Sequence, residues 1–359
     1  MKKDAVICLA AGFSQKQLIL KAKNLGLCVV AIDQDKNALC KDIVDIFICH
    51  STHSCEPILE ELAFLKSKFN WLGIINRSSG PPVVTASKIS EYLGIPGLPV
   101  SSSISIINKH ELRERCKSFN IPIPDYKIVS NLTDIDRQDI NYPIVIKPSL
   151  SMVGKSGITI VSSDKALDEA FSYAKSNTVN GKILIEEYLP GPDISHVSFV
   201  EDGNLLPIIV LDEINKEIEN GIVTSHGYKV HDRFSKNNFI KESDILSSKL
   251  VNIFKIQRSP FMTCFRANKD GLLKLIEIHL DLGGDLLMEE LFPRSLSFDY
   301  HELAVKMSIG LSEFNQENYP KPVAIFYNEG SELLNKRGFK IVEANSHEKL
   351  NKKITKAGL

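Results

Sequence analysis

The stretch YPIVIKPSLSMVGKSGITIV, residues 142–161, decides the fold, together with ILIEEYLPGPDIS, residues 183–195. In the first stretch an apolar run of β type ends at Lys147, and a small loop, GKSG, follows. Backbone N–H groups can approach phosphate oxygens only where side chains are small, and lysine adds positive charge. In the second stretch acidic residues end a predicted strand directly before Pro-Gly-Pro. Together the two stretches predict a clamp for a nucleoside triphosphate.

The composition limits the class of the protein and its surroundings. The chain has 359 residues, 43% of them hydrophobic and 24% charged, as expected for about two or three globular domains. A net charge of −1 provides no excess of cations for a nucleic-acid backbone. The 7 cysteines are an odd number without a CxxC pair, which indicates free thiols in a reducing compartment. No apolar segment approaches the length of a membrane span. We therefore expect a cytoplasmic protein that binds neither nucleic acid nor membrane.

The first hundred residues alternate between strand and helix patterns. Apolar runs at residues 5–10 and 27–33 flank a segment with helical spacing, and the pattern repeats up to residue 76. Such βαβ units predict a parallel sheet. Gly12 alone does not make a GxGxxG fingerprint, so the pattern does not indicate dinucleotide binding. The stretch GIPGLPVSSS, residues 94–103, is the best candidate for a domain boundary.

A late stretch, residues 261–285, predicts a β-hairpin. Two runs of β type flank Asp270-Gly271, a pair preferred in two-residue hairpin turns. That turn would place Cys264 directly opposite Glu277. Alternation along the second strand divides its residues between two faces, with Glu277, His279 and Asp281 on one and Ile276, Ile278 and Leu280 on the other.

These motifs resemble those of the ATP-grasp superfamily, in its carboxylate–amine ligase branch. IEEYLPGPDIS is similar to the strand of D-alanine–D-alanine ligases that binds adenine. The opening βαβ units and SKISEYLGIPG resemble the N-terminal domain of L-amino-acid ligases and carbamoyl-phosphate synthetases. The resemblance covers residues 4–310, and it gains specificity because four motifs follow one another in the order and spacing of the family.

The resemblance implies an α/β protein with a Rossmann-like pre-ATP-grasp domain followed by an α+β ATP-grasp fold. We expect the first domain at residues 1–100 and the ATP-grasp domain at residues 101–310, with a lid at about residues 125–195. Residues 311–359 would add C-terminal strands that complete the ATP-grasp region. The resemblance is also compatible with a homodimer.

The resemblance further implies the roles of single residues. Lys109 and Lys147 would contact ATP phosphates, and Asp193 would bind the ribose hydroxyls. The loop formed by Gly154, Lys155, Ser156 and Gly157 would close over the triphosphate. The strand residues Glu186, Glu187 and Leu189 would hold adenine, with the backbone of the last two contacting the edge of the base. Glu277 would bridge magnesium ions. The residues expected to act in catalysis are Lys155, Glu277 and Asp281.

The sequence departs from the family at its metal-binding motif. Relatives carry Glu-x-Asn-x-Arg with an acid 13 residues earlier, whereas this chain has Glu277, His279, Asp281 and Cys264. Magnesium prefers oxygen ligands, and thiolate or imidazole suits transition metals better. Three outcomes stay open: Mg²⁺ or Mn²⁺ held by Glu277 and Asp281, a transition metal held by Cys264, Glu277 and His279, or a loss of turnover. Arg266 or Arg294 could replace the missing arginine.

The sequence therefore favours an ATP-dependent carboxylate–amine ligase. It would activate a small carboxylate, an amino acid or peptide, as an acyl phosphate, and would form ADP and phosphate when an amine attacks. The acidic Asp281 indicates a cationic or amine group on a substrate, which we expect between the loop at residues 154–157 and the segment HGYKVHDRF, residues 226–234. That segment itself reads as a solvated loop. The alternatives are a nucleotide-binding protein with a degenerate metal site and no turnover, and phosphoryl transfer to a hydroxyl or acid.

Overall fold

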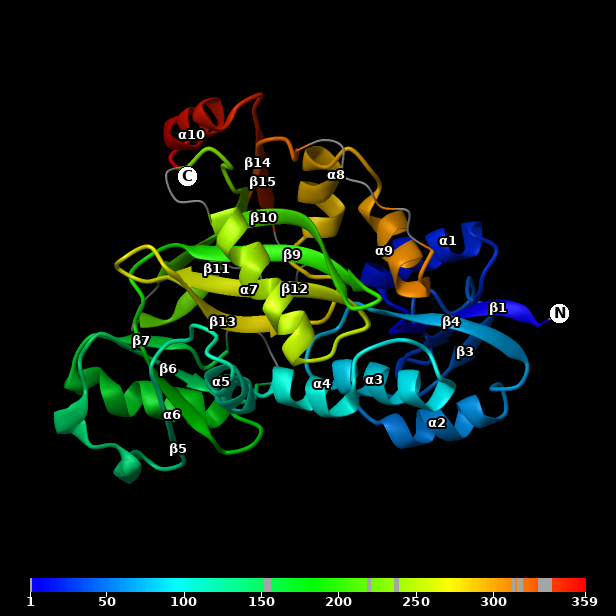
Figure 1. The fold of residues 1–359 in the computed structure, drawn as a ribbon, viewed down its shortest axis with the longest axis horizontal. Coiled ribbons are helices and arrows are strands. Elements are labelled where there is room, and N and C mark those ends of the chain that lie inside the picture. Colours follow the sequence, from blue (N-terminus) through cyan, green and yellow to red (C-terminus); the bar gives the residue numbers. More distant parts are fainter. Residues whose placement is uncertain are drawn as a thin grey trace.

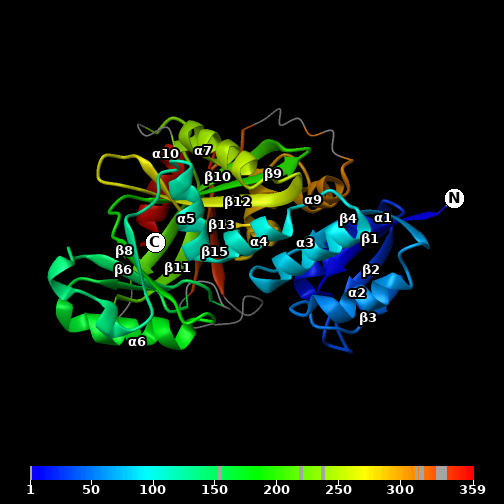
Figure 2. The same ribbon diagram turned by 60° about the horizontal axis from the view of Figure 1, so that its bottom comes forward.

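A computed structural model shows the fold (Figures 1 and 2). It describes residues 2–151, 156–217, 221–235, 239–311, 314, 319–328 and 338–359. Three sheets lie one after another along the molecule, with the N-terminal sheet at one end and a small sheet at the other (Figure 1). Within the described residues, no helix combines the length and the apolar character needed to cross a bilayer.

The N-terminal sheet is parallel, as the βαβ pattern predicts. Its strand order is β3-β2-β1-β4, and each neighbouring pair is parallel. The strands are β1 (Lys3–Leu9), β2 (Cys28–Ile32), β3 (Ile46–Ile48) and β4 (Phe69–Asn76), and the helices are α1 (Lys16–Asn24), α2 (Cys55–Ala63) and α3 (Pro81–Leu93). Strands β1 and β2 form a continuous apolar run because the helices cover both faces of the sheet.

Two short helices connect the N-terminal sheet to the small one. The predicted boundary at residues 94–103 is only partly irregular, since α4 (Val100–Ile107) begins inside it. Helix α5 (Lys109–Ser118) follows at once, and the Asn108 side chain caps it by accepting from His110 N. The N–H of Lys109 donates to the Ser149 carbonyl at 2.9 Å, which ties the start of α5 to the small sheet. The domain limits expected at residues 100 and 310 stay predictions.

The small sheet, called the lid sheet below, is antiparallel. Its strand order is β5-β8-β6-β7. The strands are β5 (Tyr126–Val129), β6 (Ile144–Pro148), β7 (Thr159–Val161) and β8 (Ile183–Glu187). One face packs on α6 (Leu167–Asn177), which contributes an apolar side to the core of the lid. The opposite face turns toward the central sheet (Figure 2).

The central sheet has the order β13-β12-β9-β10-β11-β14-β15 and is antiparallel throughout. Its strands are β9 (Asp193–Glu201), β10 (Asn204–Glu217), β11 (Val223–Val230), β12 (Arg258–Ala267), β13 (Leu273–His279), β14 (Val323–Tyr327) and β15 (Phe339–Glu343). Helix α7 (Phe239–Ile253) covers one face. The remaining helices are α8 (Phe292–Ser295), α9 (Tyr300–Ile309) and α10 (His347–Lys356). The last two strands extend the sheet through the pairing of β14 with β11.

In the hairpin of β12 and β13, Cys264 pairs with Glu277 as predicted, but the loop that joins the two strands differs from the predicted one. The loop is longer than predicted, because Asn268 N donates to Leu272 O and Gly271 has a φ of 79°. Beside the loop, Phe265 therefore pairs with Leu275, one residue out of the predicted register. A β-bulge then restores the register, so that Cys264 does pair with Glu277. The prediction for Ile276 was wrong: the bulge turns its side chain to the same cavity as Glu277.

One hydrophobic core joins the N-terminal sheet to the central sheet. It contains residues of β1, β2 and α1 together with residues of β9, β10, β14 and α9. Helix α9 crosses β4 at Gly73, where a Cβ atom would lie 1.8 Å from the Ser308 carbonyl oxygen. Only glycine fits there, and the close crossing fixes how the two sheets are oriented.

We expect Gly73→Ala to lower the free energy of unfolding by about 1–3 kcal/mol, because the added methyl group must push β4 from α9. Urea unfolding followed by circular dichroism measures the change. Gly284→Ala is the matched control, since its Cβ would meet no described atom within 4 Å and its φ lies outside the left-handed region. Equal stability of the two variants would show that the crossing does not constrain the fold.

Candidate functional site

A cavity of about 100 Å³ lies between the lid sheet and the central sheet. Strands of both sheets contribute to it, and so does the first residue of α5. The cavity brings together residues that the sequence singled out for nucleotide or metal binding: Lys109, Lys147, Glu186, Glu187, Leu189, Asp193, Cys264 and Glu277. They come from positions up to 168 residues apart in the chain (277 − 109). Residues of both stretches thus line one cavity, and their binding of a nucleotide stays a prediction.

The predicted glycine loop contributes little that can be described. Gly154 and Lys155 lie outside the described residues. Ser156 and Gly157 are described, and neither is among the residues that line the cavity. Gly157 has a φ of 78°, and a Cβ atom there would lie 2.7 Å from Pro148 Cγ and 2.9 Å from Asn177 Cβ. Packing within the lid therefore explains this glycine.

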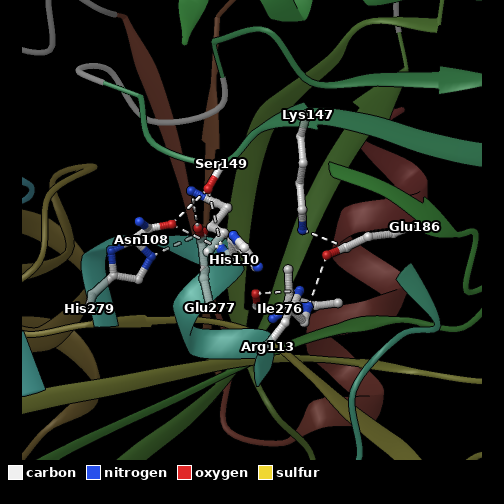
Figure 3. A network of polar contacts seen from close by, with 10 residues as sticks. Asn108, His110, Arg113, Lys147, Ser149, Glu186, Ile276, Glu277 and His279 are labelled. Carbon is white, nitrogen blue, oxygen red and sulfur yellow. Dashed lines mark hydrogen bonds and ion pairs between the residues drawn. The ribbon is translucent and has the colours of Figure 1, made fainter. Parts of the chain in front are cut away.

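Lys147 belongs to a buried cluster of charges (Figure 3). Its Nζ lies 2.6 Å from Glu186 Oε2, and the other carboxylate oxygen of Glu186 accepts from Arg113 Nε at 2.9 Å. Lys147 and Glu186 are each 3% exposed, and Arg113 is 0% exposed. The second contact of Arg113 runs from Nη2 to the Ile276 carbonyl, at 2.8 Å. Two cations face one carboxylate, so this cluster of three side chains keeps a net positive charge.

Burial dominates the electrostatics of this cluster. It lowers the pKa of Lys147 to about 8, and the Glu186 carboxylate offsets the shift only in part. Burial by itself would raise the pKa of Glu186, but the charges of Arg113 and Lys147 outweigh it and hold that pKa below its ordinary value. Glu186 is therefore ionised at neutral pH, and it orients Lys147 toward the cavity.

Sequence reasoning missed Arg113. A usable signal was present, because Lys109 and Arg113 are four residues apart and therefore share one face of α5. An arginine on a short polar helix is usually predicted to be exposed to solvent. Arg113 is buried because of contacts that form only in the tertiary structure. Of the two arginines that were considered, Arg266 reaches the cavity and lies 3.6 Å from Asp193 Oδ2. Arg294 instead pairs with Glu290 and Glu343, away from the cavity.

The strand that was expected to hold adenine ends at the cavity. The N–H of Glu187 donates to the Asp125 carbonyl at 2.9 Å, so this group is not available to a base. The Glu187 side chain pairs with Lys274. Leu189 follows the end of β8, and within the described part of the chain its N–H has no hydrogen-bond acceptor. The N–H of Leu189 is thus a hydrogen-bond donor without a partner in the described part of the chain, at the position where the edge of adenine was predicted to bind. Asp193 accepts from Asn215 Nδ2 at 2.8 Å.

Three potential metal ligands lie together beside the cavity, and two of them, Cys264 and Glu277, line it. The ligand atoms of Cys264, Glu277 and His279 all lie within 4.8 Å of one another. Glu277 Oε1 is 3.1 Å from His279 Nε2, and Glu277 Oε2 is 3.5 Å from Lys109 Nζ (Figure 3). Burial by itself raises the pKa of Glu277, but the charges of His279 and Lys109 hold it well below its ordinary value. Burial lowers the pKa of His279, and Glu277 more than reverses this, which leaves the pKa raised.

Asp281 is separate from that cluster. It is 8% exposed, and its Oδ1 accepts from Gly283 N at 2.8 Å. Its Oδ2 is buried and has no hydrogen-bond partner among the described residues. Asp281 lines a second cavity, of about 80 Å³, together with Ser79 and Gly80 from the N-terminal half. Lys109 and Glu277 line both cavities, so the two adjoin.

The segment of residues 226–234 was wrongly interpreted as a solvated loop. Its first half continues β11, and His231 is 7% exposed, with Nδ1 2.5 Å from Asp212 Oδ1. The His231 ring packs against Phe239 of α7, on the face of the central sheet opposite to the cavity between the two sheets. Residues 231–234 instead line a separate cavity of about 690 Å³. The described contacts therefore do not support the expected place of the substrate between this segment and residues 154–157.

The chain is similar to known nucleotide-dependent enzymes. Residues 108–225 match the family model "Carbamoyl-phosphate synthase L chain, ATP binding domain". A formate-dependent phosphoribosylglycinamide formyltransferase of Prochlorococcus marinus (strain MIT 9515) is 28% identical over 191 residues, covering 51% of this chain and 47% of that protein. A D-alanine–D-alanine ligase of Haemophilus influenzae (strain PittEE) is 32% identical over 170 residues, covering 45% of this chain and 55% of that protein. The chain thus spans about half the length of the curated relatives it matches.

The fold extends further than the sequence matches. The crystal structure of an L-amino acid ligase from Bacillus licheniformis superposes with a TM-score of 0.80 over 99% of this chain and 97% of that one, at 17% identity. Identity this low establishes the fold alone. The family model covers α5, the lid sheet and β9 and β10, which together form much of the cavity wall. The sequence matches and the shared fold agree with the predicted ATP-grasp fold, and residues 108–225 match an ATP-binding domain of carbamoyl-phosphate synthases.

Proposed function

We propose that this protein is an ATP-dependent carboxylate–amine ligase. The observation that carries the proposal is the convergence of Lys109, Lys147 and Leu189 on one cavity. The buried cluster around Lys147 keeps a net positive charge, which a polyphosphate would neutralise. The adjoining cavity shares Lys109 and Glu277 with the first, and it would hold a small substrate next to the terminal phosphate.

The proposed reaction has two steps, both of them group transfers. A carboxylate oxygen of the substrate attacks the γ-phosphorus, the bond to the β,γ-bridging oxygen breaks, and ADP leaves with the electron pair. An amine nitrogen then attacks the acyl carbon, the carbon–oxygen bond to phosphate breaks, and the amine loses a proton. The protein contributes position and positive charge, and no covalent intermediate on the protein is required. Lys147, held by Glu186, offsets charge on the phosphates.

Magnesium is the ion that the fold family implies beside Glu277. Mg²⁺ prefers oxygen ligands in octahedral geometry. Among Cys264, Glu277 and His279, only the glutamate offers an oxygen, and Asp281 does not belong to this cluster. This donor set does not fit Mg²⁺, so the proposed chemistry rests on the cations of the protein itself. The same misfit favours the alternative function, a nucleotide-binding protein without turnover.

Incubation of the protein with ATP, a divalent metal and pooled amino acids should form ADP and phosphate, as followed by phosphorus NMR. Lys147→Ala should reduce the rate by about 100-fold or more, because it removes charge stabilisation in a site that excludes water. Lys127→Ala, on the exposed side of the same sheet, is the matched control and should keep the parent rate. AMP with pyrophosphate would contradict the acyl-phosphate route. Nucleotide binding without any turnover would favour the alternative.

The affinity for ATP should fall as the pH rises above about 8, the pKa of Lys147 in the free protein. Lys147 is charged below this pKa and neutral above it. Above this pKa, the binding of ATP therefore requires Lys147 to take up a proton. The dissociation constant should rise by up to about tenfold per pH unit. In Lys147→Arg the guanidinium stays charged, and this slope should disappear. An identical slope in the parent and in Lys147→Arg, measured by calorimetry, would assign the titration to another group.

The free Oδ2 of Asp281 should bind the ammonium or amine group of a substrate. Asp281→Asn keeps an oxygen for Gly283 N but loses the charge, so KM for the amine should rise by about 10- to 100-fold with little change in thermal stability. Steady-state kinetics with the substrate pair found in the pool measures this. Asp270→Asn, in the exposed hairpin loop, removes a charge elsewhere and serves as control. An unchanged KM in Asp281→Asn would contradict the assignment.

A further inference from the structure

We infer that Cys264, Glu277 and His279 form a binding site for a thiophilic divalent transition metal, of which Zn²⁺ is the best match. The inference does not require ligase activity, because the site can be tested without nucleotide. It rests on three independent features of the structure: the register of two strands, the distances between the ligand atoms, and the chemistry of the donors.

The register places the three residues on one face. Cys264 of β12 pairs directly with Glu277 of β13, and His279 follows Glu277 by two residues on the same side. The bulge at Ile276 is what brings Glu277 opposite Cys264, since the hairpin loop alone would shift the pairing by one residue. Arg113 donates to the Ile276 carbonyl at the bulge, so the backbone that aims these side chains is fixed by a buried contact.

The distances are close to those of a metal centre. All three ligand atoms lie within 4.8 Å of one another, and Glu277 Oε1 is 3.1 Å from His279 Nε2. Zinc binds nitrogen, oxygen and sulfur at about 2.0–2.3 Å, so ligands in a tetrahedron are about 3.3–3.8 Å apart. Side-chain rotations that move the ligand atoms by about 1 Å would bring the cluster to that geometry, without a change in the backbone of the two strands.

The donors select the metal. A thiolate and an imidazole suit Zn²⁺ and other late transition metals, whereas Mg²⁺ prefers oxygen. Three protein ligands leave one tetrahedral position for water or substrate, as in catalytic zinc sites. Cys264 is 8% exposed, whereas the side chains of Glu277 and His279 are each 27% exposed toward the cavities. The open position therefore faces the cavity side and not the core.

The surroundings of the thiol support a ligand role. Ser195 is fully buried, and its Oγ lies 3.6 Å from Cys264 Sγ and donates to Glu213 Oε2 at 3.4 Å. When Cys264 binds a metal as a thiolate, this hydroxyl can turn to donate to the sulfur and orient it. One group opposes a metal, because Lys109 Nζ is 3.5 Å from Glu277 Oε2 and would have to turn away. Its aliphatic chain allows that movement, and Lys109 lines both cavities, so it has room on either side. The competing reading is a Glu277–His279 ion pair beside an inert thiol.

Cobalt titration of the nucleotide-free protein distinguishes the two readings. Binding at Cys264 should produce a thiolate-to-cobalt charge-transfer band in the near ultraviolet, with one cobalt per chain, and Zn²⁺ should abolish the band while Mg²⁺ should not. Cys264→Ser should remove the band. Glu277→Gln and His279→Asn should keep the thiol and weaken cobalt binding by more than about tenfold, as lost ligands do.

The control is Cys49→Ser, which removes the exposed cysteine, close in sequence to His50 and His53. It should leave the band unchanged. A band that disappears in Cys49→Ser and persists in Cys264→Ser would overturn the proposal, and so would the absence of a band in the parent protein. Circular dichroism melting of each variant separates loss of metal from loss of fold. A ligase that turns over without binding cobalt would reject this site and leave the proposed function standing.

Discussion

The buried guanidinium of Arg113 is the interaction on which the geometry of the site depends. It extends from α5 to Glu186 of the lid sheet and to the Ile276 carbonyl of the central sheet. Three parts of the fold thus meet at one side chain. Removing one partner from a buried ion pair typically costs about 3–5 kcal/mol, because the other charge is left without compensation. Each member of the cluster therefore needs the others in place.

The contacts of Arg113 connect the charged cluster around Lys147 with the potential metal ligands around Glu277. On one side Glu186 holds Lys147, whose positive charge faces the cavity. On the other side the bulge at Ile276 sets the direction of Glu277, which faces Cys264 and His279. A shift of the lid relative to the central sheet would alter both at once. This coupling offers a physical reason for a bulge and a buried arginine at the same place.

The departures from the family motif have different physical characters. Cys264 and His279 remain in contact with Glu277, so they form a coherent set of donors. Asp281 instead lies in the turn to Gly283, with one oxygen used by the backbone and the other without a hydrogen-bond partner among the described residues. A change that keeps a complete arrangement of partners is more consistent with altered chemistry than with decay.

The sequence alone predicts the parallel N-terminal sheet, the clamp strands and several of the residues that line the cavity. These features depend on local patterns: apolar runs, strand-end lysines and acids, and small loop residues. It also placed Cys264 opposite Glu277, although through a turn of the wrong length that the bulge compensates. The tertiary structure was needed to reveal the burial of Arg113, the position of Arg266 and the separation of Asp281 from the metal cluster. Each of these depends on which strands and helices meet across long stretches of chain, and burial and charge pairing arise only at such meetings.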